Sequence, residues 1–355
     1  MTKILKVLHA PYNCGNNPWE LSRAERKLGI KSDLIVLNAG QFYKNFDQNL
    51  DIRIKNLSFL DELKRLKFLK WALKNYDVFH FNYGSSIWDY LGLNLLDLPI
   101  IKNAGKKIIF TFQGDDARQK DYFVRHFGWG PYPKSYSLLD KFYDTNKRRR
   151  IKKIDYYADA IFALNPDLMY VLPKKTKFLP YASVNISQTK SIIRKKKNPK
   201  IKIIHAPSDR TIKGTEEIIQ VVKKLAYRFP LELVLIENMP HKQAIQCYQE
   251  ADIVIDQLKI GWYGGFAVEA MAMGLPVVCF LRKKDLEKFV PFWREIPIVN
   301  ADQEDLEEAL IPLIENPNLR KKLGTKSRKF VETYHDPLKI AKQTVKIYNQ
   351  LISLH

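Results

Sequence analysis

A glycine-bounded segment in the second half of the chain carries the clearest chemical pattern. Gly264–Val278 reads GGFAVEAMAMGLPVV, which predicts a glycine turn, a short helix and a buried strand. Glycines let backbone approach a ligand closely, and the unpaired N–H groups of a helix start suit a diphosphate. Glu269, the only acid in this helix, can accept hydrogen bonds from vicinal hydroxyls, as an acidic residue does on a ribose. The alternative is an ordinary structural unit with Glu269 facing solvent. The predicted backbone contacts lie on Gly264, Gly265, Phe266 and Ala267.

A basic loop is the second pattern. His205–Thr215 reads HAPSDRTIKGT and follows the first predicted strand of the second half. Arg210 and Lys213 could hold a diphosphate together, the arginine as a planar fork and the lysine as a point charge. A solvent-exposed basic loop is the alternative in a chain this basic.

The third pattern lies in the first half, where Phe110–Arg118 reads FTFQGDDAR. Acids that follow a strand of a parallel sheet lie where ligands bind. Asp115 and Asp116 are therefore candidates, and Gln113 can hydrogen-bond a sugar hydroxyl although it cannot act as a general base. The alternative is a structural loop in which an aspartate caps a helix.

A weaker candidate is the loop Pro11–Asn17, which contains Gly15 and Asn16. A simple turn would explain glycine and asparagine equally well. His9 and His80, at or near strand ends, are expected to pack and form hydrogen bonds. No HExxH or CxxC spacing occurs, so we expect neither a metal nor a cofactor.

The Gly264–Val278 segment resembles the C-terminal signature of family 4 retaining glycosyltransferases of the GT-B fold. In that family the glutamate that opens EAMAxGxPVV binds the donor ribose, which the resemblance assigns to Glu269. The Arg210 and Lys213 loop is similar to the family's Arg/Lys pair for the donor pyrophosphate. Gly15 stands in a loop that the family places near the acceptor and the donor phosphates.

The Phe110–Arg118 loop is similar to a His-Gly-Ser-Asp-type sequence of the same family. Gln113 stands where histidine is common and Asp115 where serine is common, while Asp116 matches the family's acid. The resemblance implies a catalytic role for Asp116 and contacts to acceptor or sugar for Gln113, Asp115 and Asn16.

One position departs from the family pattern. The family carries two glutamates separated by seven residues, and the first position is Gly261 here, followed by Trp262 and Tyr263. We expect the glycine loop to hold the sugar through backbone N–H groups instead.

These motifs must be positioned by the ends of strands and the starts of helices. Along the whole chain, short apolar runs alternate with amphipathic stretches. This rhythm predicts parallel sheets with helices on both faces. The expected strands are Lys3–His9, Ser32–Leu37, Asp77–Phe81, Lys106–Phe112, the end of Asp155–Leu164, Ile201–Ala206, Leu231–Ile236, Asp252–Asp256 and Pro276–Leu281. The expected helices are Glu20–Leu28, Glu216–Arg228, His241–Glu250, Phe266–Met273, Glu304–Glu315 and Pro337–Leu354.

The length of 355 residues favours two domains. A charge run with Asn and Pro makes residues 191–200 the expected linker. We predict two Rossmann-like domains facing across a cleft: residues 1–190 with the C-terminal helix 337–355 crossing back, and residues 201–336. The resemblance implies acceptor binding by the first and nucleotide-sugar binding by the second.

The net charge is +21, from 59 basic and 38 acidic residues. Such an excess attracts phosphates, nucleic acid or an anionic membrane, although compositional bias explains it equally well. No nucleic-acid-binding motif is recognisable, so no nucleic acid is expected. No apolar run is long enough for a membrane span. The stretch Leu60–Tyr76 has a basic side and an apolar side, typical of a surface helix or of one that lies on a membrane.

The resemblance therefore predicts a retaining, metal-independent glycosyltransferase of the hexosyl type. It would transfer a sugar from a nucleoside diphosphate sugar to a glycan or lipid-linked acceptor. Surface polysaccharide or glycolipid synthesis in the cytoplasm, at the inner face of the membrane, is the expected setting. The alternatives are a sugar-nucleotide epimerase of the same fold and a non-catalytic protein that binds sugar nucleotides or membranes.

Overall fold

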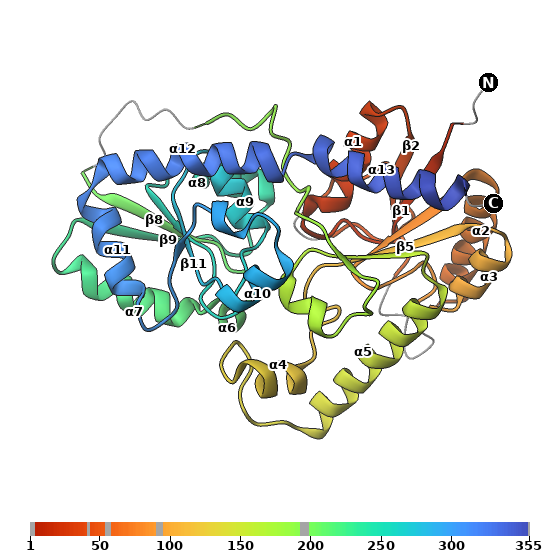
Figure 1. The fold of residues 1–355 in the computed structure, drawn as a ribbon, viewed down its shortest axis with the longest axis horizontal. Coiled ribbons are helices and arrows are strands. Elements are labelled where there is room, and N and C mark those ends of the chain that lie inside the picture. The colour runs from red at the N-terminus through yellow and green to blue at the C-terminus, as the bar shows by residue number, and fades with distance from the viewer. Residues whose placement is uncertain (1–3, 41–42, 54–57, 90–94, 192–198, 354–355) are drawn as a thin grey trace. The chain divides into compact units, whose positions relative to one another are not determined.

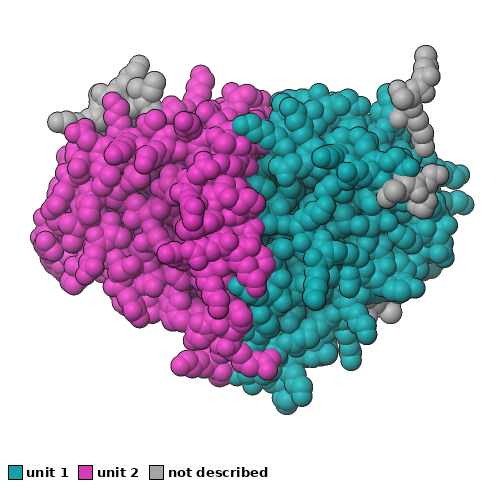
Figure 2. Space-filling model, viewed as in Figure 1, with its two compact units in different colours: residues 1–122, 136–183, 337–355 teal, residues 123–135, 184–336 magenta. Residues whose placement is uncertain are grey.

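The computed structural model describes residues 4–40, 43–53, 58–89, 95–191 and 199–353. The chain divides into two compact units, which Figure 2 colours separately. The first contains residues 1–122, 136–183 and 337–355, and the second contains residues 123–135 and 184–336. The sequence analysis placed residues 123–135 and 184–190 with the first domain. Most of the predicted linker, residues 192–198, lies outside the described residues.

The first unit is built on a parallel sheet of seven strands (Figure 1). Their order is β3 (Gln48–Asn49), β2 (Lys31–Val36), β1 (Lys6–Ala10), β4 (Val78–Asn82), β5 (Lys107–Phe112), β6 (Ala160–Ala163) and β7 (Lys177–Phe178). Strands β4 and β5 are buried along their whole length. Apolar runs of this kind form parallel strands because helices cover both faces of the sheet.

Helices cover this sheet and form its core with it. They are α1 (Asn17–Lys27), α2 (Phe59–Asn75), α3 (Asp97–Asn103), α5 (Leu138–Tyr157) and α13 (Pro337–Ser353). The C-terminal helix α13 belongs to this unit and packs on α1. Tyr348 Oη donates to Glu25 at 2.8 Å and Thr344 Oγ1 donates to it at 3.0 Å. The prediction that the last helix returns to the first unit is confirmed.

The second unit has a parallel sheet of five strands. Their order is β12 (Val299–Asn300), β11 (Val277–Cys279), β10 (Ile253–Ile255), β8 (Ile201–His205) and β9 (Leu231–Leu235). Its helices are α6 (Arg210–Lys213), α7 (Thr215–Ala226), α8 (His241–Tyr248), α9 (Gly265–Ala272), α10 (Lys283–Phe289), α11 (Leu306–Glu315) and α12 (Pro317–Tyr334). Helix α4 (Lys120–Phe127) begins in the first unit and ends in the second. Two Rossmann-like α/β units were predicted, and this fold class is confirmed.

Among the long helices, α5 was given no bounds from the sequence, and α12 was not assigned at all. Its sequence PNLRKKLGTKSRKFVETY is polar and contains Gly324, which weakens the helical pattern. The structure shows why glycine stands there, because a Cβ on Gly324 would lie 2.0 Å from the carbonyl oxygen of Gly274. Within the described residues, no helix has both the length and the apolar character that a membrane crossing requires.

Candidate functional site

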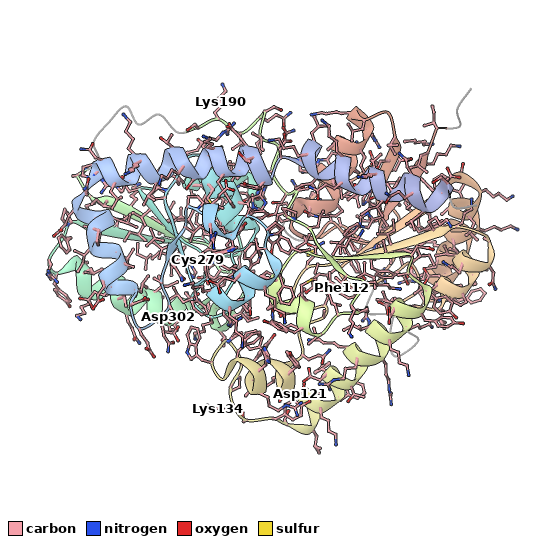
Figure 3. All side chains as sticks on the ribbon, in the orientation of Figure 1. Phe112, Asp121, Lys134, Lys190, Cys279 and Asp302 are labelled. Carbon is pink, nitrogen blue, oxygen red and sulfur yellow. The ribbon has the colours of Figure 1, made fainter. Side chains whose placement is uncertain are left out.

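The site loops leave the carboxyl ends of the strands, after β1 and β5 in the first unit and after the neighbouring strands β8 and β10 in the second. Figure 3 labels Phe112 at that end of β5 and Cys279 at that end of β11. In the second unit, the chain runs outward from β8 to β9 on one side and to β10 on the other. Ligands of doubly wound sheets bind at such a switch point. The loops after β8 and β10 carry Lys213 and Gly264.

Lys213 and Gly264 meet at one buried carboxylate. The Nζ of Lys213 lies 2.7 Å from Oδ1 of Asp256, and the Gly264 amide donates to Oδ2 at 2.6 Å. Asp256 is fully buried, whereas 12 % of the Lys213 side chain is exposed. The pair therefore fixes the ammonium in place, and part of the lysine side chain remains exposed.

The absence of a side chain at Gly264 keeps this space open. A Cβ there would lie 3.3 Å from Lys213 Nζ and 3.4 Å from Asp256 Oδ2. Helix α9 begins at the next residue, and no side chain caps its start. Its first amides, on Gly265, Phe266 and Ala267, directly follow Gly264, whose Cβ position lies beside the fixed lysine ammonium. Amides at a helix start and a lysine together suit a diphosphate.

Sequence reasoning missed Asp256, although one signal was present. This acid directly follows the buried strand β10, and acids after strand ends had already been singled out in the first half of the chain. Its partner Lys213 is 43 positions away in the sequence. Only the fold could reveal that the two are a pair.

Glu269 lies on α9 and is 4 % exposed, so the solvent-facing alternative is wrong. Its Oε1 lies 2.7 Å from Nε2 of His241, the first residue of α8. The carboxylate is thus held by a histidine that sequence reasoning did not connect with it.

The His241–Glu269 pair should make stability depend on pH. Burial lowers the pKa of His241, but the hydrogen bond to Glu269 and its negative charge outweigh burial and raise the pKa above 6.5. A raised pKa means that the pair stabilises the folded state fully below the unfolded value of about 6.5. This contribution is lost as the pH rises through the folded pKa.

We therefore expect His241→Gln to lower the melting temperature more at pH 5.5 than at pH 8.5, as measured by thermal unfolding at both values. In a Glu269→Gln background, the same substitution should show no such difference. An equal effect of His241→Gln at both pH values in the parent protein would contradict the proposed ion pair.

Arg210 has partners of its own. Its Nε and Nη2 donate to the two oxygens of Glu237 at 2.8 and 2.9 Å, and Nη1 donates to Glu216 at 2.6 Å. These carboxylates raise the pKa of Arg210. Lys213 bonds to Asp256 instead, so Arg210 and Lys213 share no partner. A ligand would have to compete with two carboxylates for the Arg210 guanidinium.

We expected the backbone amides of the Gly261–Gly265 loop to hold a sugar. For the Gly264 amide this expectation is wrong. That amide already donates to Asp256. Trp262 and Tyr263 are fully buried, and the Tyr263 hydroxyl lies 2.8 Å from Nε2 of His335. The loop is therefore anchored by its side chains in the core of the second unit.

The space that a side chain at Gly261 would need is filled by another residue. Its φ of +91° favours glycine, and a Cβ there would lie 2.7 Å from Nη1 and 2.8 Å from Cβ of Arg282. Arg282 is itself held by an ion pair with Asp285 at 3.0 Å and by the Phe127 ring, 3.8 Å from its guanidinium carbon. A glutamate cannot replace Gly261 unless Arg282 moves.

Gly261→Glu is therefore expected to destabilise the protein without improving donor binding or turnover. Gly261→Ala should lower the free energy of unfolding by about 1–3 kcal/mol more than Gly29→Ala, the cost of overpacking a filled site. Gly29 is a matched control, because its φ is +81° and no atom lies within 4 Å of its ideal Cβ. Denaturant unfolding measures both. Equal effects of the two alanines would show that Arg282 yields freely.

In the first unit, Gln113 and the loop after β1 come together. A Cβ on Gly15 would lie 3.8 Å from Oε1 of Gln113. Among the described residues, the buried Nε2 of Gln113 has no hydrogen-bond partner. Buried donors are nearly always paired. A ligand hydroxyl or carbonyl in this loop would supply the missing acceptor.

Asp116 turns its carboxylate onto its own loop. Its Oδ1 accepts from the Gly114 amide at 2.7 Å, and Oδ1 and Oδ2 accept from the Gln113 amide at 3.1 Å. Burial raises the pKa of Asp116 to about 6 despite these bonds. Burial and the neighbouring Asp116 raise the pKa of the Cys14 thiol to about 12. Asp116 thus orders the Gln113 loop by closing a turn, and it does not cap a helix.

Asp115 lies on the same loop with its side chain 41 % exposed, and it bonds to Nη1 of Arg118 at 2.8 Å. Nε of Arg118 donates to Asp167, after β6, at 2.7 Å. Sequence reasoning assigned no role to Arg118 or Asp167, which are 49 positions apart. This buried ion pair ties the loop after β5 to the one after β6.

Asn16 is used within the fold. Its Nδ2 donates to the Ser183 carbonyl at 3.2 Å and to Glu20 Oε1 at 3.3 Å, and the residue is buried. The neighbouring Asn17 accepts from the Ala182 amide at 2.6 Å. Both asparagines therefore position the loop after β1, in which Gly15 lies.

His9 and His80 form hydrogen bonds inside the core of the first unit. Nε2 of His9 lies 2.9 Å from Glu25, and His80 lies 2.7 Å from both Tyr348 Oη and Thr111 Oγ1. His9, Glu25 and His80 are the one group among the described residues whose ligand atoms, all within 4.8 Å of one another, could hold a metal. These atoms instead join α1 and α13 to the sheet.

One pocket of the second unit lies away from Lys213. It has a volume of about 490 Å³ and is lined by Asp252 and Pro276, which precede β10 and β11, and by Arg320 of α12. It therefore lies at the amino ends of the strands, opposite the site loops.

Comparison with known proteins gives a partial family match for the second unit. Residues 212–330 match the family model described as "Glycosyl transferases group 1". The matched part contains Lys213, Asp256, Gly264 and Glu269. No curated protein matches the chain by sequence.

Solved structures match over nearly the whole length. Sucrose-phosphate synthase from Thermosynechococcus elongatus is 14% identical with a TM-score of 0.60, covering 99% of this chain and 100% of that one. HepE from Anabaena, solved with UDP and glucose, is 13% identical with a TM-score of 0.62, covering 98% and 100%. A UDP-N-acetylglucosamine 2-epimerase described as putative, from Listeria monocytogenes, is 12% identical with a TM-score of 0.52, covering 97% and 95%. At such identities the likeness shows the shared fold, which is GT-B.

Proposed function

We propose that this protein is a glycosyltransferase that moves a sugar from a nucleoside diphosphate sugar to an acceptor hydroxyl with retention of configuration. The observation that carries the proposal is the Lys213–Asp256–Gly264 arrangement beside the start of α9. The match of residues 212–330 to a glycosyltransferase family supports it. Retention and the hexosyl type rest on the family 4 resemblance of the Gly264–Val278 segment.

The second unit binds the donor in this proposal. Lys213 and the first amides of α9 neutralise the diphosphate as the bond from its oxygen to the anomeric carbon breaks. Glu269 accepts hydrogen bonds from the ribose hydroxyls. The protein's own positive groups supply the charge that a metal ion would otherwise supply, so transfer is metal-independent and needs no cofactor. Arg210 contributes only where the diphosphate displaces Glu216 or Glu237.

The first unit binds the acceptor, a glycan or a lipid-linked molecule. The unpartnered Nε2 of Gln113 supports this assignment, because it offers a buried donor next to Gly15. Asp116 holds the Gln113 loop in shape, and its pKa of about 6 allows it to exchange a proton with an acceptor hydroxyl near neutral pH. Surface polysaccharide or glycolipid synthesis at the inner face of the membrane is the setting that we propose.

Thermal unfolding with a panel of nucleoside diphosphates and nucleotide sugars, with and without EDTA, tests the donor site. Ligands that bind the native state raise the melting temperature by mass action. We expect a selective rise with one diphosphate that EDTA does not abolish. A protein that shows no rise with any nucleotide is not the proposed transferase.

Epimerisation is the alternative function, because the Listeria protein described as a putative epimerase has a similar fold. Product analysis distinguishes it from transfer. The selected nucleotide sugar is incubated without any acceptor, and its sugar is analysed. A transferase leaves the stereochemistry of the nucleotide sugar unchanged, whereas an epimerase releases an altered nucleotide sugar.

A further inference from the structure

Helix α5, which is labelled in Figure 1, carries large apolar and basic side chains that are exposed to solvent. Leu138, Phe142 and Tyr156 are 86%, 64% and 81% exposed. At 100° per residue, positions 138, 142 and 156 lie on one side of a helix. The exposed Arg149 and Lys152 fall on the same side. We call these five residues the outward face of α5.

The opposite side of α5 holds the helix on its unit. Ile151 and Ile154 are buried in the core of the first unit. Asp144 is buried and accepts from the Lys120 and Asp121 amides at 3.0 and 2.9 Å. The helix therefore cannot rotate to bury its outward face without losing these contacts.

The first turn of α5 is held in place although its side chains are exposed. Ser137 and Asp140 form a reciprocal capping box, in which the Asp140 amide donates to Ser137 Oγ at 3.1 Å. Lys120 Nζ lies 2.8 Å from Asp140 Oδ2. Leu138 and its neighbour Leu139, 60% exposed, are thus displayed on a formed helix. Large apolar side chains gathered on one exposed face mark an interaction surface.

The charges on this helix point to an anionic partner. Seven Lys and Arg residues stand against three Asp residues in α5. Arg148 is paired with Asp121 and Arg150 with Asp89. In the part of the chain that the structure describes, Arg149 and Lys152 have no ion-pair partner. A second copy of the same face would meet these cations with cations, so self-association is disfavoured.

We propose that the outward face of α5 docks this protein on a bilayer that contains anionic phospholipids. Leucine and aromatic side chains enter the boundary between headgroups and acyl chains, and lysine and arginine pair with anionic headgroups. This proposal gives the membrane setting proposed above a defined docking surface, and it does not depend on the transfer reaction. The net charge of +21 would also attract the protein to such an anionic surface.

The helix that the sequence had suggested for this role is a weaker candidate. In α2, Phe68 and Leu69 are buried, and the ring of Trp71 packs on those of Phe68 and Tyr76 at 5.9 and 5.6 Å. Arg65 is buried and donates to the Ile87 carbonyl. One side of α2 is therefore used within its own unit, whereas Phe59, Leu60 and Leu66 remain exposed.

Co-sedimentation of the full chain with vesicles tests the proposal. One set contains phosphatidylcholine alone, and the other contains phosphatidylcholine with phosphatidylglycerol. We expect binding to the mixed vesicles that falls as salt is added, and little binding to pure phosphatidylcholine. Arg149→Gln with Lys152→Gln should weaken binding about 10- to 30-fold, since each charge near the surface contributes about 1 kcal/mol.

Leu138→Ser with Phe142→Ser should weaken binding similarly while the melting temperature stays unchanged, because both side chains are exposed in the folded state. Tyr227→Ser is the matched control, since Tyr227 is 93% exposed on the second unit. Equal vesicle binding by the parent and both double variants would overturn the proposal. So would a dimer in size-exclusion chromatography that only the α5 variants lose, which would make this face a protein interface. Because sedimentation needs no nucleotide sugar, its outcome is independent of the transferase proposal.

Discussion

Replacing Lys213 with methionine is expected to lower the rate of sugar transfer by about 10²- to 10³-fold, the usual loss when one group that stabilises developing charge is removed. Lys213 is the cation that Asp256 holds beside the start of α9. Without it, the leaving diphosphate keeps the α9 amides but loses the nearest fixed positive charge. A radiolabelled or coupled transfer assay measures the change.

Loss of stability must be separated from loss of catalysis in this variant. Removing one partner of a buried ion pair leaves a charge without compensation, which costs about 3–5 kcal/mol. The double variant Lys213→Met with Asp256→Asn removes both charges and should recover most of that stability. Transfer should stay low in it. Lys224→Met is the matched control, because Lys224 is an exposed lysine that pairs with Glu307. A folded Lys213→Met protein with the parent rate would rule out the proposed role of this lysine.

Much of the framework could be predicted because local patterns determine it. Parallel strands such as β4 and β5 are buried on both faces, so they read as continuous apolar runs. Glycine turns and helix starts are also local features, which is why the Gly264–Val278 segment and the Phe110–Arg118 loop could be singled out. Strand ends then define where ligands bind in such sheets.

The side-chain partners in the site could not be predicted in the same way. Lys213 and Asp256 are 43 positions apart, and His241 and Glu269 are 28 apart. The first pair forms because the loops after β8 and β10 leave neighbouring strands, and the second because the fold brings α8 within hydrogen-bond distance of α9. No local pattern in the sequence records either contact. The reason for a glycine at position 261 could not be predicted either, because it depends on Arg282, which fills the space that a side chain there would need. The prediction that Arg210 binds the diphosphate could not include its ion pairs with Glu216 and Glu237.

The second large effect is expected at Glu269. Glu269→Ala should raise the dissociation constant for the nucleoside diphosphate by about 10- to 100-fold, because hydrogen bonds to a charged group contribute about 1.5–3 kcal/mol. Isothermal titration with the diphosphate selected by thermal unfolding measures this. The buried carboxylate is bonded to His241, so His241→Ala serves as the control for simple disruption of that contact. We expect a smaller loss of affinity in His241→Ala.

A ligand lacking one ribose hydroxyl makes the test specific. If Glu269 accepts hydrogen bonds from the ribose, the 2′-deoxy nucleoside diphosphate should bind the parent protein more weakly than the ribose form. The difference between the two ligands should disappear in Glu269→Ala, because the hydroxyl then has no carboxylate to meet. Such a cycle isolates the coupling between one side chain and one ligand group. An equal preference for the ribose form in parent and variant would mean that Glu269 supports α8 through His241 and does not contact the donor.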